Sequence, residues 1–212
     1  MSKKILTIDF DIVMYPCLQI YNDYVSGNAN PTENWEYLKR ERGIEPFMRY
    51  DAKTLMLIGR IINKQRNVHN AHFFVCSEHQ EVVDNLKLSD TFNEDKFDIV
   101  NIDFHHDIWY RPEDKNILLS FDDYNCSNWL GYLILKEKTE SVQWYGAHNS
   151  SNFFDNEYKN GELPYTRYRL DELSELENIA FDEVYFVLSP QWVPYEFCHL
   201  FDLIINLTDK GE

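Results

Sequence analysis

Cysteines are few in this chain, and none of them are spaced as metal-binding or disulfide-bonded pairs. The four residues Cys17, Cys76, Cys126 and Cys198 are scattered along the sequence and include no C-x-x-C pair. This distribution argues against a zinc knuckle and against a disulfide framework, so we interpret the four side chains as free thiols. Free thiols are typical of the reducing cytoplasm, where we expect the protein to be located.

Long apolar runs are also missing. The apolar stretch near the N-terminus is interrupted by Asp9 and Asp11, so it does not have the form of a signal peptide. No other run approaches the roughly 20 apolar residues that a membrane-spanning helix needs. We therefore expect no membrane association.

Positive charge is scarce. The chain has 36 acidic and 20 basic residues, which gives a formal net charge of −16. Such a surface repels nucleic acids and anionic membranes, and it attracts cationic ligands. Because many soluble proteins are acidic for solubility alone, we use the charge only to disfavour nucleic acid and to favour a basic partner.

Apolar residues are frequent enough for a folded core. They make up 44% of the 212 residues, and 16% of the chain is aromatic. A chain of this length and composition can bury one sizeable core, so we predict a single domain over residues 1–212.

Strand and helix patterns alternate along the chain. Short runs rich in β-branched and aromatic residues predict buried strands at 4–9, 72–76, 98–103, 141–146 and 183–188. Apolar residues at helical spacing predict helices at 51–65, 125–138, 170–178 and 195–206. Alternating strands and helices indicate an α/β fold, here a three-layer α/β/α sandwich with a mainly parallel sheet.

The longest predicted loop runs from Ser26 to Arg49. It contains Asn30, Pro31, Gly43 and Pro46, all of which favour turns or helix ends. We expect either a lid over the functional site or a plain surface excursion.

Residues able to bind a metal follow three of the predicted strands. Open parallel sheets bind their ligands beyond the carboxyl ends of the strands, so these side chains are expected to meet. They are Asp9 and Asp11 after the first strand, His79 after the second, and Asp103, His105 and Asp107 after the third.

The sharpest of these patterns is Asp103-x-His105-x-Asp107. Alternate residues of an extended segment project to the same side, so two carboxylates and an imidazole could converge on one centre. The motif alone would also fit a solvated loop. Here an apolar strand precedes it and Ile108 and Trp109 follow it, which favours a buried site.

Asp9 and Asp11 present the same chemistry. Two acids that emerge from one buried strand repel each other unless a cation lies between them. Alternatively, one could cap the next segment while the other meets an arginine. His79 is a candidate metal ligand only because it lies at a strand end. His106 could be no more than a buried neighbour of the site.

Taken together, these segments resemble the metal motifs of the arginase, agmatinase and histone-deacetylase superfamily. Ser77-Glu78-His79 is similar to the family's G-G-D-H segment, with Glu in place of Asp. Asp103 to Asp107 is similar to D-A-H-x-D, and Thr7 to Asp11 is similar to S-x-D-x-D. The third segment stands first in this chain, so the strand order looks circularly permuted relative to arginase.

The resemblance extends to the small permuted branch that includes the peptide arginases. It implies a hydrolase that converts arginine side chains of a peptide to ornithine and urea. It also implies two divalent ions, with Mn²⁺ preferred, which together acidify a shared water. By this resemblance Asp9 and Asp103 bridge the ions, His79 and Asp107 complete one site, and Asp11 and His105 complete the other.

Further roles are less directly implied. Asp107 is expected to take part in catalysis, while the proton-shuttle histidine of arginase is replaced by the Cys126-Ser127-Asn128 segment. His148 or His106 is therefore the expected shuttle, with His148 preferred. Glu196 and Asn128 are the expected contacts of the cationic substrate.

Two other functions stay open. Asp9 and Asp11 also fit the D-x-D start of a haloacid-dehalogenase phosphatase, with Asp9 as nucleophile, but this leaves His79, His105 and Asp107 unused. Alternatively, the chain is a non-catalytic module that binds a basic peptide through its acidic face.

Overall fold

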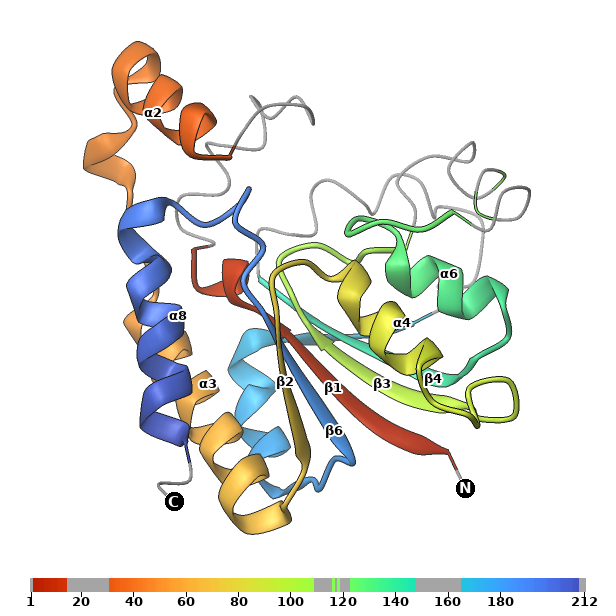
Figure 1. Ribbon diagram of the computed structural model, residues 1–212. Helices are drawn as coiled ribbons and strands as arrows, with labels where there is room; N and C mark the ends of the chain where they lie inside the picture. The colour runs from red at the N-terminus through yellow and green to blue at the C-terminus, as the bar shows by residue number, and fades with distance from the viewer. Residues whose placement is uncertain are drawn as a thin grey trace.

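A six-stranded, all-parallel sheet forms the centre of the fold (Figure 1). The computed structural model describes residues 2–14, 31–108, 116, 118, 123–147 and 165–209. The strands lie in the order β2-β6-β1-β3-β4-β5. Their bounds are β1 (Lys3–Asp9), β2 (His72–Cys76), β3 (Phe97–Ile102), β4 (Thr139–Gly146), β5 (Thr166–Arg169) and β6 (Glu183–Val187).

Helices cover both faces of this sheet. On one face lie α3 (Ala52–Lys64), the 3₁₀ helix η5 (Leu170–Asn178) and α8 (Tyr195–Thr208), and on the other lie α4 (Gln80–Lys87) and α6 (Trp129–Leu135) (Figure 1). The prediction of a three-layer α/β/α sandwich is therefore confirmed. None of the helices in the described residues combines the length and the apolar character needed to cross a membrane.

The central strand β1 shows why the sheet needs both layers. Leu6 and Ile8 are buried in the core beneath α3 and α8, whereas Ile5 is buried in the core beneath α4 and α6. A parallel strand covered on both faces needs apolar side chains on both of its sides, and Ile5, Leu6 and Ile8 supply them in β1.

The predicted loop from Ser26 to Arg49 is wrong over its described part. That part contains α2 (Pro31–Arg42) and the 3₁₀ helix η2 (Glu45–Phe47), while residues 26–30 lie outside the described residues. Proline suits the first turn of a helix, and Gly43 ends α2 in the left-handed region with φ +61°. Two residues taken as turn signals, Pro31 and Gly43, are therefore helix boundaries.

Other boundaries also differ from the prediction. The edge strand β5 and the short helix α4 were not predicted, because each is shorter than a clear periodic pattern requires. The helix predicted over 125–138 is only α6, since the Asn128 side chain accepts a bond from the Asn125 amide in a turn before it. Beyond the C-terminal end of α6, Glu137 has a φ of 55°, a left-handed conformation that does not continue the helix.

The crevice between β1 and β3 is the natural ligand site of this topology. After β1 the chain crosses towards one edge of the sheet to form β2, whereas after β3 it continues towards the other edge to form β4. Connections that leave two neighbouring strands in opposite directions open a crevice at the carboxyl edge. The end of β1 and the segments that follow β1 and β3 carry five of the six predicted metal ligands, and His79 follows β2.

Helix α6 fixes the segment after β3 through its backbone. The amides of Leu130 and Gly131 both donate to the Asp107 carbonyl oxygen at 3.1 Å. A Cβ atom on Gly131 would lie 1.9 Å from the carbonyl oxygen of Ile108. Only glycine allows this close approach.

We expect Gly131→Ala to destabilise the protein by about 1–3 kcal/mol, because the methyl group forces α6 away from the Asp107 segment. Chemical denaturation measures the effect. The control is Gly59→Ala in α3, where an added Cβ meets no atom within 4 Å; it should stabilise the helix by about 0.5–1 kcal/mol. A Gly131→Ala variant as stable as the wild type would contradict this prediction.

Candidate metal centre

Six buried side chains meet at the carboxyl edge between β1 and β3. All six were singled out as metal ligands from the sequence, and each is at most 9% exposed. They come from the segments after β1, β2 and β3, which lie far apart in the sequence. They are Asp9, Asp11, His79, Asp103, His105 and Asp107.

His79 lies at the centre of one half of this site. Its Nδ1 is 2.9 Å from Asp107 Oδ2, 3.2 Å from Asp9 Oδ2 and 3.4 Å from Asp103 Oδ2. One nitrogen therefore contacts three carboxylates. Its Nε2 is buried and has no hydrogen-bond partner among the described residues, so the polar contacts of the ring go to the carboxylates.

His105 has the same arrangement in the other half. Its Nδ1 is 3.1 Å from Asp11 Oδ2 and 4.0 Å from Asp103 Oδ1. Asp103 thus lies between the two histidines. Two sets of potential ligand atoms result, one from Asp9, His79 and Asp103 and the other from Asp11, Asp103 and His105, each within 4.8 Å of one another.

Three of the ligand carboxylates have no lysine or arginine partner among the described residues. In the described part of the chain, no lysine or arginine forms an ion pair with Asp9, Asp11 or Asp103. Burial and the charge of Asp11 raise the pKa of Asp9 to about 8. Burial and the neighbouring aspartates also raise the pKa of Asp103 well above its usual value. A cation between these groups would remove this penalty.

The pKa values of the two histidines are raised by the neighbouring carboxylates. Burial alone would lower the pKa of His79, but the charges of Asp9 and Asp107 raise it. The pKa of His105 is raised in the same way, against burial, by Asp11. Metal binding at these nitrogens would therefore release protons. An oxygen-rich set with two imidazoles suits Mn²⁺, Fe²⁺ or Zn²⁺ better than a thiolate-preferring ion, so the residues fit a divalent metal.

Backbone amides hold one oxygen of each of three carboxylates, and the other oxygen lies towards a histidine. Asp9 Oδ1 accepts from the Asp11 amide at 2.9 Å, and Asp103 Oδ1 accepts from the His105 amide at 2.8 Å. Asp11 Oδ1 accepts from the Phe104 amide at 3.3 Å. The Oδ2 atoms are those nearest the histidines, so the ligand geometry is organised by the chain itself.

Three further side chains support the ligands. The indole Nε1 of Trp129 donates to Asp107 Oδ2 at 2.9 Å, and the Ser189 hydroxyl donates to Asp9 Oδ2 at 2.5 Å. Asn101 Nδ2 lies 3.3 Å from Asp103 Oδ2. No role was assigned to these three side chains from the sequence, where Asn101 and Trp129 match strand and helix patterns and Ser189 directly follows the strand predicted over 183–188.

Strained backbone is found in the same place. Asp107 and Ser189 have φ values of 51° and 49°, in the left-handed region that side chains other than glycine seldom adopt. Both residues contact the ligand cluster. Such strain persists where the surroundings impose it, which is frequent at functional sites.

The other predicted site residues lie further from the carboxylates or cannot be placed. His106 is buried, and its ring stacks on Tyr165 and points its edge at Trp144. Burial lowers the pKa of His106 to about 4, so its ring is neutral at physiological pH. His148 lies outside the described residues.

The two predicted substrate contacts have partners within the protein. Glu196 pairs with Lys39 of α2, and its side chain is 48% exposed. Asn128 uses its side-chain oxygen to accept from the Asn125 amide. The structure therefore brings together the six predicted metal ligands but gives Glu196 and Asn128 structural contacts.

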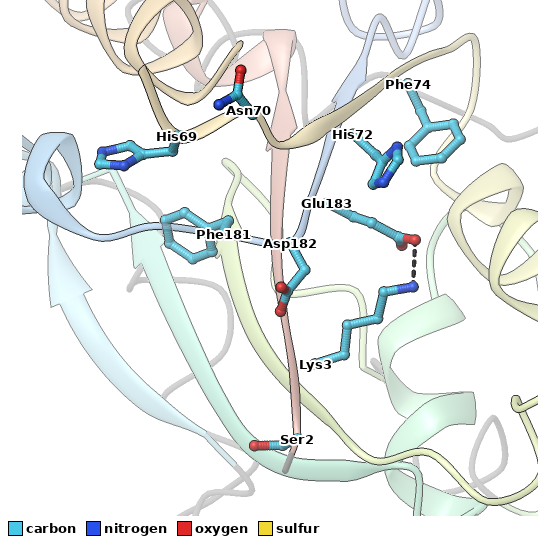
Figure 2. A pocket seen from close by; sticks show the side chains of 9 residues that line it. All are labelled: Ser2, Lys3, His69, Asn70, His72, Phe74, Phe181, Asp182 and Glu183. Atoms are coloured by element: carbon cyan, nitrogen blue, oxygen red, sulfur yellow. Dashed lines mark hydrogen bonds and ion pairs between the residues drawn. The ribbon is translucent and has the colours of Figure 1, made fainter. Parts of the chain in front are cut away.

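A pocket of about 640 Å³ lies at the opposite, amino edge of the sheet (Figure 2). Its lining includes Lys3, His72 and Glu183, each at the start of its strand. Lys3 and Glu183 form an ion pair there. None of the predicted site residues lines this pocket, so it is separate from the candidate metal centre.

Comparison with models of protein families, with curated proteins and with solved structures finds no match for this chain.

We expect protein purified without chelator to hold about two equivalents of a divalent ion such as Mn²⁺. Asp103→Asn should lose both ions, because Asp103 belongs to both ligand sets, whereas Asp11→Asn should lose about half of the metal. Plasma mass spectrometry measures the content. Asp171→Asn, at an exposed acid paired with Arg169, is the control and should match the wild type. A wild type that takes up no metal after addition of Mn²⁺ would contradict the prediction.

Trp129→Phe should weaken metal binding by roughly 10–100-fold, because the lost indole N–H orients the Asp107 carboxylate. Competition with a fluorescent chelator measures the affinity. Tyr132→Phe in the same helix is the matched control. Equal metal affinities of Trp129→Phe and the wild type would show that the indole bond does not organise the site.

Proposed function

We propose that this protein is a binuclear-metal amidinohydrolase that hydrolyses the guanidinium of arginine side chains in a peptide, releasing urea and leaving ornithine. The observation that carries the proposal is the pair of buried Asp/His ligand sets that share Asp103. The resemblance of the same residues to the arginase motifs supports the choice of reaction. The net charge of −16 is compatible with a basic peptide.

The residues that would hold the metals follow from the geometry. Asp9, His79 and Asp103 would hold one ion with Asp107 beside them, and Asp11, Asp103 and His105 would hold the other. Two divalent ions in such a site lower the pKa of water from about 15.7 towards neutrality and so supply hydroxide at physiological pH. Burial of the ligands excludes bulk water from the reacting atoms.

The overall reaction consumes one water. Its oxygen bonds to the guanidinium carbon, and the bond from that carbon to the side-chain nitrogen breaks. The nitrogen leaves as the ornithine amine after it gains a proton, and the carbon leaves as urea. Asp107 can accept a hydrogen bond from the attacking water, and His148 is the proposed proton donor, because His106 is enclosed by Trp144 and Tyr165.

The free thiols support a reducing environment. Cys76, Cys126 and Cys198 form no disulfide in the structure. We therefore propose that the enzyme acts in the cytoplasm.

The test is incubation of the Mn²⁺-loaded protein with a library of arginine-containing peptides. Urea release and conversion of arginine to ornithine, both followed by mass spectrometry, should occur with the wild type. Asp103→Asn should reduce both to background, because it removes a ligand common to the two sets.

Two other results would contradict the proposal. Release of phosphate from a phosphomonoester without urea formation would favour the haloacid-dehalogenase alternative. Tight binding of basic peptides without any conversion would favour a non-catalytic module.

A further inference from the structure

One acidic side chain at the rim of the candidate metal centre is held by neutral groups. Glu78 is half-buried and directly precedes His79. Its Oε2 accepts a hydrogen bond from Gln191 Nε2 at 3.1 Å, and the Cys126 thiol also bonds to its carboxylate. We call Glu78, Cys126 and Gln191 the rim cluster.

The rim cluster borders the ligands themselves. Burial and the charges of Asp107, Glu78 and Asp9 raise the pKa of the Cys126 thiol to about 12, so Cys126 stays protonated. Gln191 Nε2 lies 3.7 Å from Cys126 Sγ. The cluster therefore lies beside the corner of the centre that contains His79 and Asp107.

A single turn after β6 connects the rim cluster to both halves of the centre. Ser189 bonds to Asp9, Gln191 bonds to Glu78, and the Trp192 ring lies 4.5 Å from the His105 ring between centroids. The turn is closed by a 2.9 Å bond from the Trp192 amide to the Ser189 carbonyl. The same turn thus fixes a metal ligand and the rim carboxylate.

Glu78 differs in its partners from three glutamates that form ion pairs with basic side chains. Glu183 pairs with Lys3, Glu177 with Arg60, and Glu196 with Lys39. For Glu78, no lysine or arginine of the described residues provides an ion pair. A carboxylate has about four acceptor positions, and the two neutral donors leave some of them for an external donor.

The charge of the metal centre favours a further carboxylate for a cationic substrate. Two divalent ions would carry as many positive charges as the four aspartates carry negative ones. Until a water is deprotonated, an occupied centre would therefore have no excess negative charge with which to attract a guanidinium. An acidic group outside the ligand set would add that attraction, and Glu78 directly precedes the ligand His79.

We propose that Glu78, oriented by Gln191, is the residue that binds the guanidinium of the substrate and holds it at the metal centre. This inference rests on the proposed function, because it names the substrate contact of the same site. A guanidinium presents a planar fork of N–H donors, which a carboxylate accepts through two parallel bonds. Gln191 keeps the carboxylate plane fixed, so less rotational freedom is lost on binding.

Binding of N-acetyl-L-arginine amide to the Mn²⁺-loaded full-length protein tests the proposal. The neutral analogue N-acetyl-L-citrulline amide serves as the comparison ligand, and calorimetry measures both affinities. Glu78→Gln should weaken binding of the arginine amide by roughly 10–100-fold, the range expected for a hydrogen bond to a charged group. Its affinity for the citrulline amide and its metal content should stay unchanged.

Two further variants complete the experiment. Glu140→Gln, in β4 at the amino edge of the sheet, removes the same charge far from the site and should bind the arginine amide as the wild type does. Gln191→Leu leaves Glu78 charged but unsupported, so we expect a smaller, several-fold loss of affinity. Because Gln191 is outside the ligand set, this variant decides the matter if Glu78→Gln fails to fold or to hold metal.

The outcomes separate this inference from the proposed function. Unchanged arginine-amide affinity in Glu78→Gln and Gln191→Leu, or no binding by the wild type, overturns the inference. If binding depends on Glu78 but no peptide releases urea, the inference stands and the hydrolase function is rejected. Urea release with an unchanged KM in Glu78→Gln supports the hydrolase and rejects the role of Glu78.

Discussion

Repulsion among buried aspartates is the constraint on which the organisation of this site depends. Asp9, Asp11 and Asp103 are buried at the carboxyl edge of the sheet, and in the described part of the chain they form no ion pair with a lysine or arginine. The protein compensates in part through backbone amides, the hydroxyl of Ser189 and two imidazoles. These donors are neutral or only conditionally charged, so they reduce the penalty without removing it. A bound divalent cation would remove it, and this is why we read the cluster as a metal centre.

The sheet order and a few backbone contacts place these side chains together. The sheet order places the ends of β1 and β3 side by side, where their connections diverge and open a crevice. Helix α6 then locks the segment after β3, because Gly131 allows its backbone to touch that of Ile108. The left-handed conformation of Asp107 turns its side chain back towards His79, within reach of the Trp129 indole. Packing and ligand geometry are therefore coupled through a few backbone contacts.

The sequence predicted the parts of this arrangement that depend on local patterns. Apolar runs located five of the six strands, and the motif Asp103-x-His105-x-Asp107 indicated three buried ligands. The structure brings these ligands together through bends and a left-handed Asp107, not through the extended segment that was expected. Properties that depend on distant residues were out of reach. Helix α2 was taken for a loop, so the pairing of Glu196 with Lys39 could not be anticipated. The bond between Glu78 and Gln191 joins residues 113 positions apart, and no local pattern indicates it.

The two tiers of acidic groups suggest how such a site would distinguish substrate from product. The inner aspartates could hold metal ions, whereas the rim carboxylate Glu78 is proposed to bind an organic cation. Hydrolysis converts the cationic guanidinium into neutral urea and an ammonium that lacks the planar fork. If Glu78 binds the guanidinium, its charge pairing with that group is lost after the reaction, because urea is neutral. A site that needs this planar cation therefore rejects a neutral isostere, because the half-buried carboxylate is left without its partner. The same difference favours release of urea.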